Sequence, residues 1–543
     1  MNTPNAVRKC PTRYAASVHA ALLALLAVLF MPSCAQRIIV KQKVGSVVGK
    51  SVDLDELRRT WSAVYAGKAS DSQIAEYNDE VADLLVKLAG YRIPDPGQES
   101  VRLNSLRGSF DLLIDPDGKS DIDIRNYDQV YVSTFLRIKR GLKDHVVTEG
   151  LGASLALRSP PGEDDPFISP EGLWRPATAI VEFNGRNGSP KLIVYDPLKR
   201  DQVQCGGHRD GLRCDFTAPL ATGVVGQTAQ IINIPAMLNF EKFEDKLDLF
   251  RISPLDPDKT VCLLVHGLKS SPATWRDTAN EMLADPVIRE KYEFWTYGYP
   301  TGAPIPYSAM RLREDIRNMI AFRRANGAET NNMIVIGHSM GGLLAKTLTQ
   351  SSGVENWNRL FKKSVNELDV TGDQRKLLRD MVYFEPVPAV KRVVFVSTPH
   401  RGSDFASNPL GKVASRLIEM PSNLVRLSDQ IMMESSNALT PLGLKFAVQP
   451  PTSIDQLRED SVLLTLLDNV PLHPNVTYHS IIGRKNLRDP IEECTDGVVS
   501  YWSAHIDEAV SEVVVNSDHG AHQSEEGIAE ITRILRLHAG ARD

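Results

Sequence analysis

The 543-residue chain has little net charge and no repeated or low-complexity segment. Each absence excludes some classes of protein. Its 62 basic and 67 acidic side chains leave a formal net charge of -5, so no basic excess supports nucleic-acid binding. A composition of 42% hydrophobic and 24% charged residues is that of a globular protein with a sizeable core, not of a disordered one. The length suffices for two or three domains.

Long apolar runs are scarce too, and the clearest one lies near the start of the chain. The run "AALLALLAVLFM", Ala20–Met31, follows three basic residues and is shorter than the roughly 18 residues that a membrane-spanning helix needs. This order predicts a secretory signal over residues 1–34. The segment ending at Cys34 resembles a bacterial lipoprotein signal, which implies a lipidated Cys34 and a membrane-anchored protein. A cleaved signal would instead release a periplasmic or secreted protein, so we expect export in both cases.

Only six cysteines are present, a number that is compatible with export without demanding it. Cys205 and Cys214 flank a glycine-rich turn and could form a hairpin disulfide or stay as free thiols. A zinc site with His208 is disfavoured because the spacing matches no known site. The acidic segment "DPDGKSDID", residues 115–123, lacks the spacing of an EF-hand and predicts a hairpin turn. We expect no metal and no cofactor.

The chain after the leader divides into three regions by the spacing of its apolar residues. Residues 35–100 hold apolar side chains three and four apart, which predicts a helical segment. Residues 101–242 hold short apolar segments such as "ATAIVEF" and "PKLIVYD" between Gly, Pro, Asn and Asp, which predicts an antiparallel β-rich accessory domain. In residues 243–543, short apolar strands alternate with longer helices.

This alternation in residues 243–543 predicts an α/β fold with a mostly parallel sheet, since buried parallel strands read as continuous apolar runs and are joined by helices. The strands that we expect are "TVCLLVHG", "YEFWTYGY", "MIVIGHS", "RVVFVSTP", "TYHSIIG" and "EVVVNS". Two long helical stretches, near residues 353–385 and 403–470, are too long for ordinary connections. We expect them to form a cap or lid over the sheet.

The segment "MIVIGHSMGGLLAK", Met333–Lys346, contains the pattern that points to chemistry. Strand formers precede Ser339 and helix formers follow it, with Gly337 and Gly341 two residues away on either side. This is the G-x-S-x-G nucleophile-elbow pattern in the context that it requires. The glycines let strand and helix approach closely, while the serine takes an uncommon backbone conformation at a cost of about 1–3 kcal/mol. The pattern predicts an exposed nucleophilic Oγ beside a helix N-terminus that can bind an oxyanion.

A serine is a weak nucleophile until a base removes its proton, so a histidine and an orienting acid are needed as well. Asp496 follows the strand "TYHSIIG" and His519 follows the last strand, so both are expected at the same edge of the sheet as Ser339. His519 would act as general base and then acid, and Asp496 would hold its imidazole in the useful tautomer. His522 remains the alternative base and Asp404 the alternative acid.

These motifs resemble the α/β-hydrolase family, and within it bacterial esterases and lipases and the relatives of GPI-inositol deacylase. The resemblance covers about residues 255–540 and rests on "LLVHGLKSSPATW", "YGYPTG", "IGHSMGGLLAK", "VFVSTPHRGSD" and "TDGVVSYWSA". It implies an α/β-hydrolase fold with helical cap insertions. It also implies that the backbone N–H groups of Met340 and Leu268 form the oxyanion hole.

Five other side chains near these motifs are expected to have structural roles. His338 and His400 belong to family-like motifs, and we expect each to make structural hydrogen bonds. Trp295, Tyr297 and Tyr299 alternate along a predicted strand, which favours ordinary packing over the lining of a pocket.

We therefore expect an exported serine hydrolase that cleaves carboxylic esters, of lipids or of other acyl compounds, through an acyl-enzyme. Acyl transfer follows from the residues, whereas "ester" and "lipid" come from the resemblance and the expected cap. The same triad would serve an acyltransferase or an amide or thioester hydrolase. An inactive, surface-anchored binding lipoprotein is a further alternative. The expected partner is a small-molecule or lipid ester, and the oligomeric state is not predicted.

Overall fold

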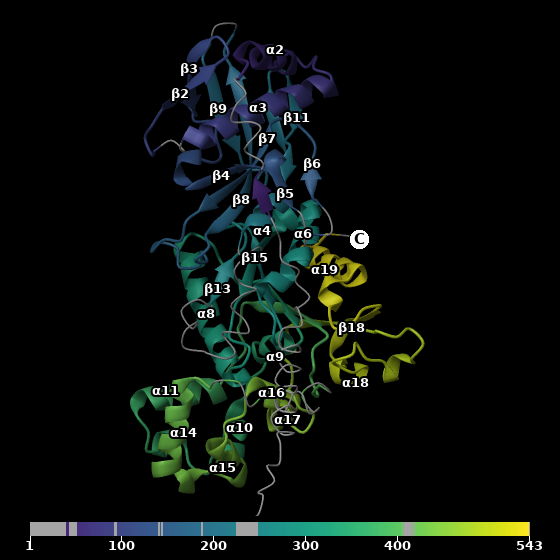
Figure 1. Cartoon of the computed structure of the whole chain (residues 1–543). Helices are drawn as coiled ribbons and strands as arrows, with labels where there is room; N and C mark the ends of the chain where they lie inside the picture. Colours follow the sequence, from purple (N-terminus) through teal and green to yellow (C-terminus); the bar gives the residue numbers. More distant parts are fainter. Residues whose placement is uncertain are drawn as a thin grey trace, which may run out of the picture.

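The computed structural model describes residues 40–42, 52–91, 95–138, 142, 145–185, 188–223, 248–403, 406, 415, 418 and 420–541. The molecule is elongated, with a β-rich unit at one end, a mostly parallel sheet in the middle and a group of helices at the other end (Figure 1). The predicted leader with Cys34 and the alternative acid Asp404 lie outside the described residues. Among the described helices, none is long and apolar enough to cross a membrane.

The N-terminal unit is built on a six-stranded sheet of order β2-β3-β9-β8-β7-β4, in which only β3 and β9 are parallel. Three two-stranded pairs, β1–β5, β6–β12 and β10–β11, accompany it. The elements are α2 (Leu54–Tyr65), α3 (Asp71–Tyr91), α4 (Thr217–Thr222), β1 (Val40–Gln42), β2 (Ser100–Ser105), β3 (Gly108–Ile114), β4 (Gln129–Val132), β5 (Leu136–Ile138), β6 (Val147–Thr148), β7 (Ala153–Ser159), β8 (Leu173–Phe183), β9 (Pro190–Tyr195), β10 (Gln202–Cys205), β11 (His208–Gly211) and β12 (Cys214–Asp215).

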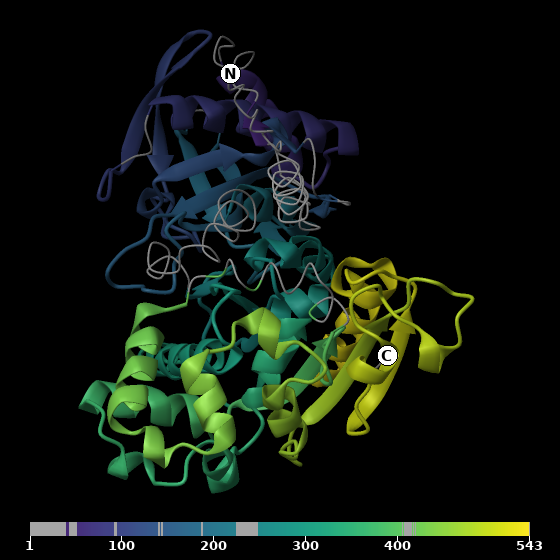
Figure 2. The same cartoon turned by 60° about the horizontal axis from the view of Figure 1, so that its bottom comes forward.

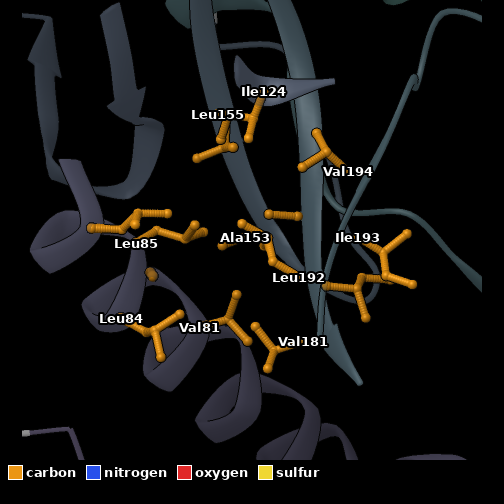
Figure 3. Packing of buried hydrophobic residues seen from close by; sticks show 14 of the residues in the cluster. Val81, Leu84, Leu85, Ile124, Ala153, Leu155, Val181, Leu192, Ile193 and Val194 are labelled. Atoms are coloured by element: carbon orange, nitrogen blue, oxygen red, sulfur yellow. The ribbon is translucent and has the colours of Figure 1, made fainter. Parts of the chain in front are cut away.

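Helix α3 and this sheet share one hydrophobic core (Figure 3). The Tyr77 hydroxyl of α3 donates to the carbonyl oxygen of Val181 in β8 and accepts from its N–H, both at 2.9 Å. The predicted boundary at residue 100 therefore falls between elements that pack together. The facing apolar side chains are Val81, Leu84 and Leu85 of α3 with Leu155, Val181 and Leu192 of the sheet.

The structure decides two local predictions in this unit, the state of its two cysteines and the shape of the acidic segment. Cys205 and Cys214 are both free and buried, because the β10–β11 hairpin sets Cys205 opposite His208 while Cys214 pairs in β12 with β6. The acidic segment 115–123 forms a turn, in which the Asp115 carboxylate accepts the N–H of Lys119 at 2.7 Å. It is not the predicted hairpin turn, because β3 pairs with β2 and β9 and not with the next strand, β4.

The C-terminal unit is built on a seven-stranded sheet of order β13-β15-β14-β16-β17-β18-β19. The six predicted strands are all present and mutually parallel. An additional strand that the pattern did not predict, β13, pairs antiparallel with β15. The strands are β13 (Leu249–Arg251), β14 (Thr260–Val265), β15 (Tyr292–Tyr297), β16 (Met333–His338), β17 (Val390–Val396), β18 (Thr477–Gly483) and β19 (Ala509–Val515).

Both faces of this sheet are covered, because successive side chains of its strands point to opposite sides. Leu263 and Val335 enter the core under α8 and α9, whereas Leu264 and Ile334 enter the core under α6, α7 and α19. The covering helices are α6 (Arg276–Ala284), α7 (Pro286–Lys291), α8 (Ile305–Ala325), α9 (Met340–Thr347) and α19 (Glu525–His538), with the short α18 (Tyr501–Ala504) at one edge.

The strand order reverses at β14, and this reversal opens a site. After β14 the chain crosses to β15 on one side and then returns to β16 on the other side. Loops that leave the carboxyl ends of such strands diverge, and ligands of open α/β sheets bind in the crevice between them. The loops after β14 and β16 are those that carry Leu268 and Ser339.

The predicted cap is formed by helices with a hydrophobic cluster of their own, at the end of the molecule away from the N-terminal unit (Figure 1). Both predicted insertions contribute to it. The cluster is formed by α10 (Gly353–Leu360), α11 (Gly372–Val382), α14 (Ser422–Glu434) and α15 (Pro441–Val448), whereas α16 (Ser453–Gln456) and α17 (Val462–Asp468) pack into the core under α8 and α9.

The loop between β7 and β8 joins the two units. Its Phe167 ring packs edge-on against Trp295 and Phe322 of the C-terminal unit, with ring centroids 5.1 Å apart in each pair. Asp165 of the same loop forms an ion pair with Arg251 of β13, whose side chain is 3% exposed. One side chain of the N-terminal unit, Phe167, thus belongs to the core of its neighbour.

Candidate active site

Ser339 lies between strand β16 and helix α9 with φ 53° and ψ -126°. Its N–H donates to the carbonyl oxygen of Val396 at 2.8 Å, and its own carbonyl oxygen accepts the N–H of Gly342 at 2.9 Å. A non-glycine residue with positive φ costs about 1–3 kcal/mol, and such strain persists only where the surrounding structure imposes it. The backbone is therefore held in the sharp turn that the sequence pattern predicted.

The glycines around Ser339 are required by close backbone contacts. A Cβ atom at Gly341 would lie 2.3 Å from the carbonyl oxygen of Val265, and one at Gly337 would lie 2.6 Å from the Cα of Gly342. In the loop after β14, a Cβ atom at Gly267 would lie 2.8 Å from the Cβ of Ser339. The loop that carries Leu268 is thus in contact with the candidate nucleophile.

The structure brings the three predicted triad residues together. His519 Nε2 lies 2.9 Å from Ser339 Oγ, and His519 Nδ1 lies 2.7 Å from Asp496 Oδ2. When the Nδ1–H is donated to the carboxylate, Nε2 carries the lone pair and can accept the serine proton. Both distances are within hydrogen-bonding range, so a proton can pass from Ser339 to His519 without any rearrangement of the backbone.

Asp496 is buried and held as a carboxylate. Its second oxygen, Oδ1, accepts the N–H groups of Val498 at 2.8 Å and Val499 at 2.7 Å. Burial by itself would raise the pKa of this carboxyl, but the neighbouring His519 and the backbone donors outweigh it and hold the pKa below its usual value. An ionised Asp496 can therefore orient His519 and stabilise it when it becomes an imidazolium.

The two predicted oxyanion donors belong to segments that meet at Ser339, the start of α9 and the loop after β14. Met340 is the first residue of α9, where backbone N–H groups have no partner within the helix. Leu268 follows Gly267 in the loop after β14. The next residue, Lys269, has φ 57° and donates its N–H to Thr301 Oγ1 at 3.2 Å, which connects this loop to the one after β15.

The strand order of the C-terminal unit and the elbow geometry together decide its fold. Six parallel strands with the reversal at β14, and a strained serine between β16, the third of these strands along the sheet, and helix α9, meet the structural context of the motif. The C-terminal unit is an α/β-hydrolase domain. Residues 256–422 of this domain match the family model described as "Putative serine esterase (DUF676)". This match confirms the prediction of a serine hydrolase of the esterase type.

Several solved structures also resemble the hydrolase domain. Lipase BlEst2 of Bacillus licheniformis in its mature form is 15% identical, with 53% of this chain and 97% of that chain covered and a TM-score of 0.32. Phospholipase PlaB from Legionella pneumophila is 13% identical over 52% of this chain and 61% of that chain, with a TM-score of 0.31. Esterase B from Lactobacillus rhamnosis is 11% identical over 53% of this chain and 79% of that chain, with a TM-score of 0.30. No curated protein matched the chain.

The alternative base, His522, faces away from the nucleophile of the hydrolase domain. It lies in the 3-10 turn Ala521–Gln523, is 1% exposed, and its Nε2 lies 2.7 Å from Thr274 Oγ1. Burial lowers the pKa of His522 well below its ordinary value. The structure therefore places His519, and not His522, against Ser339.

His338, which precedes the serine, supports the loop that carries His519. Its Nε2–H donates to the backbone carbonyl oxygen of His519 at 2.7 Å, and its ring packs on His522 with centroids 3.9 Å apart. Burial lowers the pKa of His338 to about 3, so the ring is neutral at physiological pH. This is the structural hydrogen-bonding role that the sequence suggested, although its partner could not be inferred.

The remaining predicted residues fall into packing roles. Trp295, Tyr297 and Tyr299 are buried, as the packing interpretation required, and the Tyr299 hydroxyl donates to the carbonyl oxygen of His266 at 2.7 Å. His400 is 1% exposed, but its ring does not make the expected hydrogen bonds: neither ring nitrogen has a hydrogen-bond partner among the described residues, and the ring packs edge-on against Phe395 with centroids 4.7 Å apart. Within the ranges that the structure describes, no group of three or more His, Cys, Asp or Glu side chains is arranged to hold a metal ion.

Sequence reasoning missed Thr274 and Thr301. Neither has a distinctive spacing. Thr274, in the 3-10 turn Pro272–Trp275 after β14, holds His522 away from the nucleophile, and Thr301, in the loop after β15, holds the backbone N–H of Lys269, next to Leu268. Their only sequence signal is that each follows a predicted strand at the carboxyl edge of the sheet.

Proposed function

We propose that the protein is an exported serine hydrolase that cleaves carboxylic esters through an acyl-enzyme, with Ser339, His519 and Asp496 as its triad. One observation carries the proposal: His519 bridges the other two side chains, with its Nε2 2.9 Å from Ser339 Oγ and its Nδ1 2.7 Å from Asp496. The match of residues 256–422 to a serine esterase model agrees with this chemistry.

In this mechanism, His519 Nε2 takes the proton of Ser339 as Oγ attacks the ester carbonyl carbon. The developing oxyanion accepts the N–H groups of Met340 and Leu268, each of which contributes roughly 3–4 kcal/mol in comparable sites. His519 then gives the proton to the departing alcohol, which leaves an acyl-enzyme on Ser339. Water repeats these steps on the acyl-enzyme and releases the acid.

The proposal is tested with p-nitrophenyl esters and a fluorophosphonate probe on the wild type and on Ser339→Ala. We expect the variant to lose a factor of about 10⁴–10⁶ in kcat, as triad deletions do, and to lose labelling by the probe. Ser436→Ala, at an exposed position of the cap, is the matched control and should behave as the wild type does. Equal turnover by Ser339→Ala and the wild type would exclude the mechanism.

We also propose that residues 1–34 direct export and that Cys34 becomes the lipidated N-terminus. The basic residues, the apolar run and the "PSC" sequence before Ala35 support this reading. In a bacterial host fed labelled palmitate, we expect the wild type and Cys10→Ser to incorporate label and sediment with membranes, and Cys34→Ser to do neither. Label in Cys34→Ser, or none in the wild type, would contradict lipidation at this cysteine.

A further inference from the structure

The loop that carries Asp496 is long and has little regular structure of its own. It connects β18, which ends at Gly483, to β19, which begins at Ala509, and this fully described stretch contains only α18 and the 3-10 turn Ile491–Glu493. In Figure 2 the yellow region that contains the loop lies at the side of the molecule away from the green cap. Long loops place a functional side chain accurately only where a rigid scaffold holds them. Asp496 therefore needs support from outside its own loop.

That support comes from residues 399–403 after β17, within the motif "VFVSTPHRGSD". The backbone N–H of His400 donates to the carbonyl oxygen of Ser503 at 3.0 Å. Ser503 Oγ accepts the N–H of Arg401 at 3.2 Å and donates to the carbonyl oxygen of Gly402 at 2.6 Å. These bonds join the segment after β17 to the loop that carries Asp496.

The segment after β17 is also fixed from its other side. The backbone N–H of Ser403 donates to the carbonyl oxygen of Leu457 at 2.8 Å. Gly402 has φ 110°, and a Cβ atom there would lie 2.6 Å from the Cα of Glu459. Both contacts are made with the chain between α16 and α17. Ser403 is therefore held between this chain and the loop of Asp496.

The side chain of Ser403 makes the contact that reaches Asp496. Its Oγ is buried and donates to the carbonyl oxygen of Val498 at 2.8 Å. That carbonyl belongs to the same peptide group as the N–H of Val499, which donates to Asp496 Oδ1 at 2.7 Å. A hydrogen bond to the oxygen of a peptide group polarises the group and strengthens the bond that its N–H donates. Ser403 therefore acts on the Asp496 carboxylate through one peptide group, without touching the carboxylate itself.

We propose that Ser403 is a positioning residue of the triad, which orients and stabilises the Asp496 carboxylate through this peptide group. The proposal rests on the proposed esterase function and extends its machinery by one residue. The series of hydrogen bonds runs from Ser403 to Asp496 and from there to His519 and Ser339. Because Ser403 acts through Asp496, its loss should slow the chemical step without weakening the binding of substrate.

The test measures kcat and KM for p-nitrophenyl butyrate on the wild type, Ser403→Ala and Ser403→Thr. We expect Ser403→Ala to lower kcat by about threefold to tenfold, the range that one neutral hydrogen bond supplies, with KM within about twofold of the wild type. Ser403→Thr keeps the hydroxyl and should recover most of the lost kcat. An unchanged kcat in Ser403→Ala, or a rise in KM alone, would overturn the assignment.

Ser503 provides the matched control, because its hydroxyl joins the same two segments at another point. It bonds to the backbone of Arg401 and Gly402 and not to the peptide group that holds Asp496. Ser503→Ala should lower the melting temperature about as much as Ser403→Ala does, while its kcat stays within about twofold of the wild type. Equal losses of kcat in the two variants would show that Ser403 only holds the segments together, and the proposal would be wrong.

A double-mutant cycle with Asp496→Asn tests whether Ser403 acts through Asp496. Once Asp496 has been replaced, Ser403→Ala should change kcat by less than about twofold, because residues that act in one hydrogen-bonded series are not additive. The same fold-loss in both backgrounds would refute the proposed route.

The outcomes separate this proposal from the function beneath it. If Ser339→Ala loses turnover but Ser403→Ala keeps the full kcat, the positioning role is wrong although the esterase function stands. If Ser339→Ala turns over the ester as fast as the wild type does, the esterase function fails first and the role of Ser403 fails with it.

Discussion

At Asp496, a buried carboxylate meets one imidazole nitrogen and two backbone N–H groups, and its role can be tested without removing volume. Asp496→Asn keeps the shape but favours the wrong tautomer of His519, so we expect kcat for p-nitrophenyl butyrate to fall by about 10⁴. The measurement is kcat with the melting temperature of each protein. A variant that keeps full turnover would show that Asp496 does not orient His519.

The sign of the pH effect at Asp496 follows from its lowered pKa. A carboxyl whose folded pKa lies below its unfolded value stabilises the fold above the unfolded pKa, and this contribution is lost as pH falls through the folded pKa. We expect the free energy of unfolding to fall in acid by a smaller amount in Asp496→Asn than in the wild type, as measured by urea unfolding at pH 7 and at about pH 2, below the unfolded pKa of about 3.9. An equal loss in both proteins would contradict a lowered pKa.

Gly341 tests the close approach at the elbow. Gly341→Ala places a methyl group 2.3 Å from the carbonyl oxygen of Val265, so we expect a loss of at least about 1–3 kcal/mol in the free energy of unfolding. Gly372→Ala is the matched control, because a Cβ atom at Gly372 meets no other atom within 4 Å and helical alanine is favoured over glycine by roughly 0.5–1 kcal/mol. Urea unfolding of both variants measures the difference.

At the scale of the element, helix α8 contains an acidic residue, Asp315, whose charged form is disfavoured in the folded protein. Burial, with the nearby Asp248 as a second cause, raises the pKa of Asp315 to about 7, against the opposing attraction of Arg311. Between the unfolded pKa and this folded value the unfolded chain ionises more readily, so the stability of the fold falls as pH rises from about 4 to 7.

Replacing Asp315 removes this dependence. We expect Asp315→Asn to be more stable than the wild type at pH 8, with little difference at pH 4, as measured by urea unfolding at both values. Glu329→Gln, at an exposed carboxylate just beyond the same helix, is the control and should not change the pH dependence. A greater stabilisation by Asp315→Asn at pH 4 than at pH 8 would reverse the sign and refute the explanation.

The elements themselves were largely predictable. The six parallel strands and the helices α6, α8, α9 and α19 follow from continuous apolar runs and helical spacing, which are properties of short windows of sequence. Strand β13 could not be predicted, because "LFR" is only three residues long and becomes a strand only through its pairing with β15. The turn at residues 115–123 was predicted, but the prediction that it joins two paired strands was wrong. The reason is the same, because strand pairing depends on residues that are far apart in the sequence.

At the scale of the whole molecule, Phe167 tests whether the two units are coupled. Its ring belongs to the N-terminal unit but packs against Trp295 and Phe322, so Phe167→Ala should cost about 3–5 kcal/mol in the free energy of unfolding. Leu106→Ala, at a 61% exposed position of the same unit, should cost little. A Phe167→Ala protein as stable as the Leu106→Ala control, by urea unfolding, would show that the contact contributes nothing.

The sequence by itself determined the elbow, the strand and helix alternation, and the identity of the residues that could act together, because each depends on neighbours within about ten positions. Only the tertiary structure decided which of two histidines meets Ser339. His519 and His522 leave the same strand three residues apart, and the turn between them points one at the nucleophile and the other at Thr274. It also decided that the cap helices and the start of α8 leave a cavity of about 190 Å³ between them, since that space depends on how distant segments pack and not on any one of them.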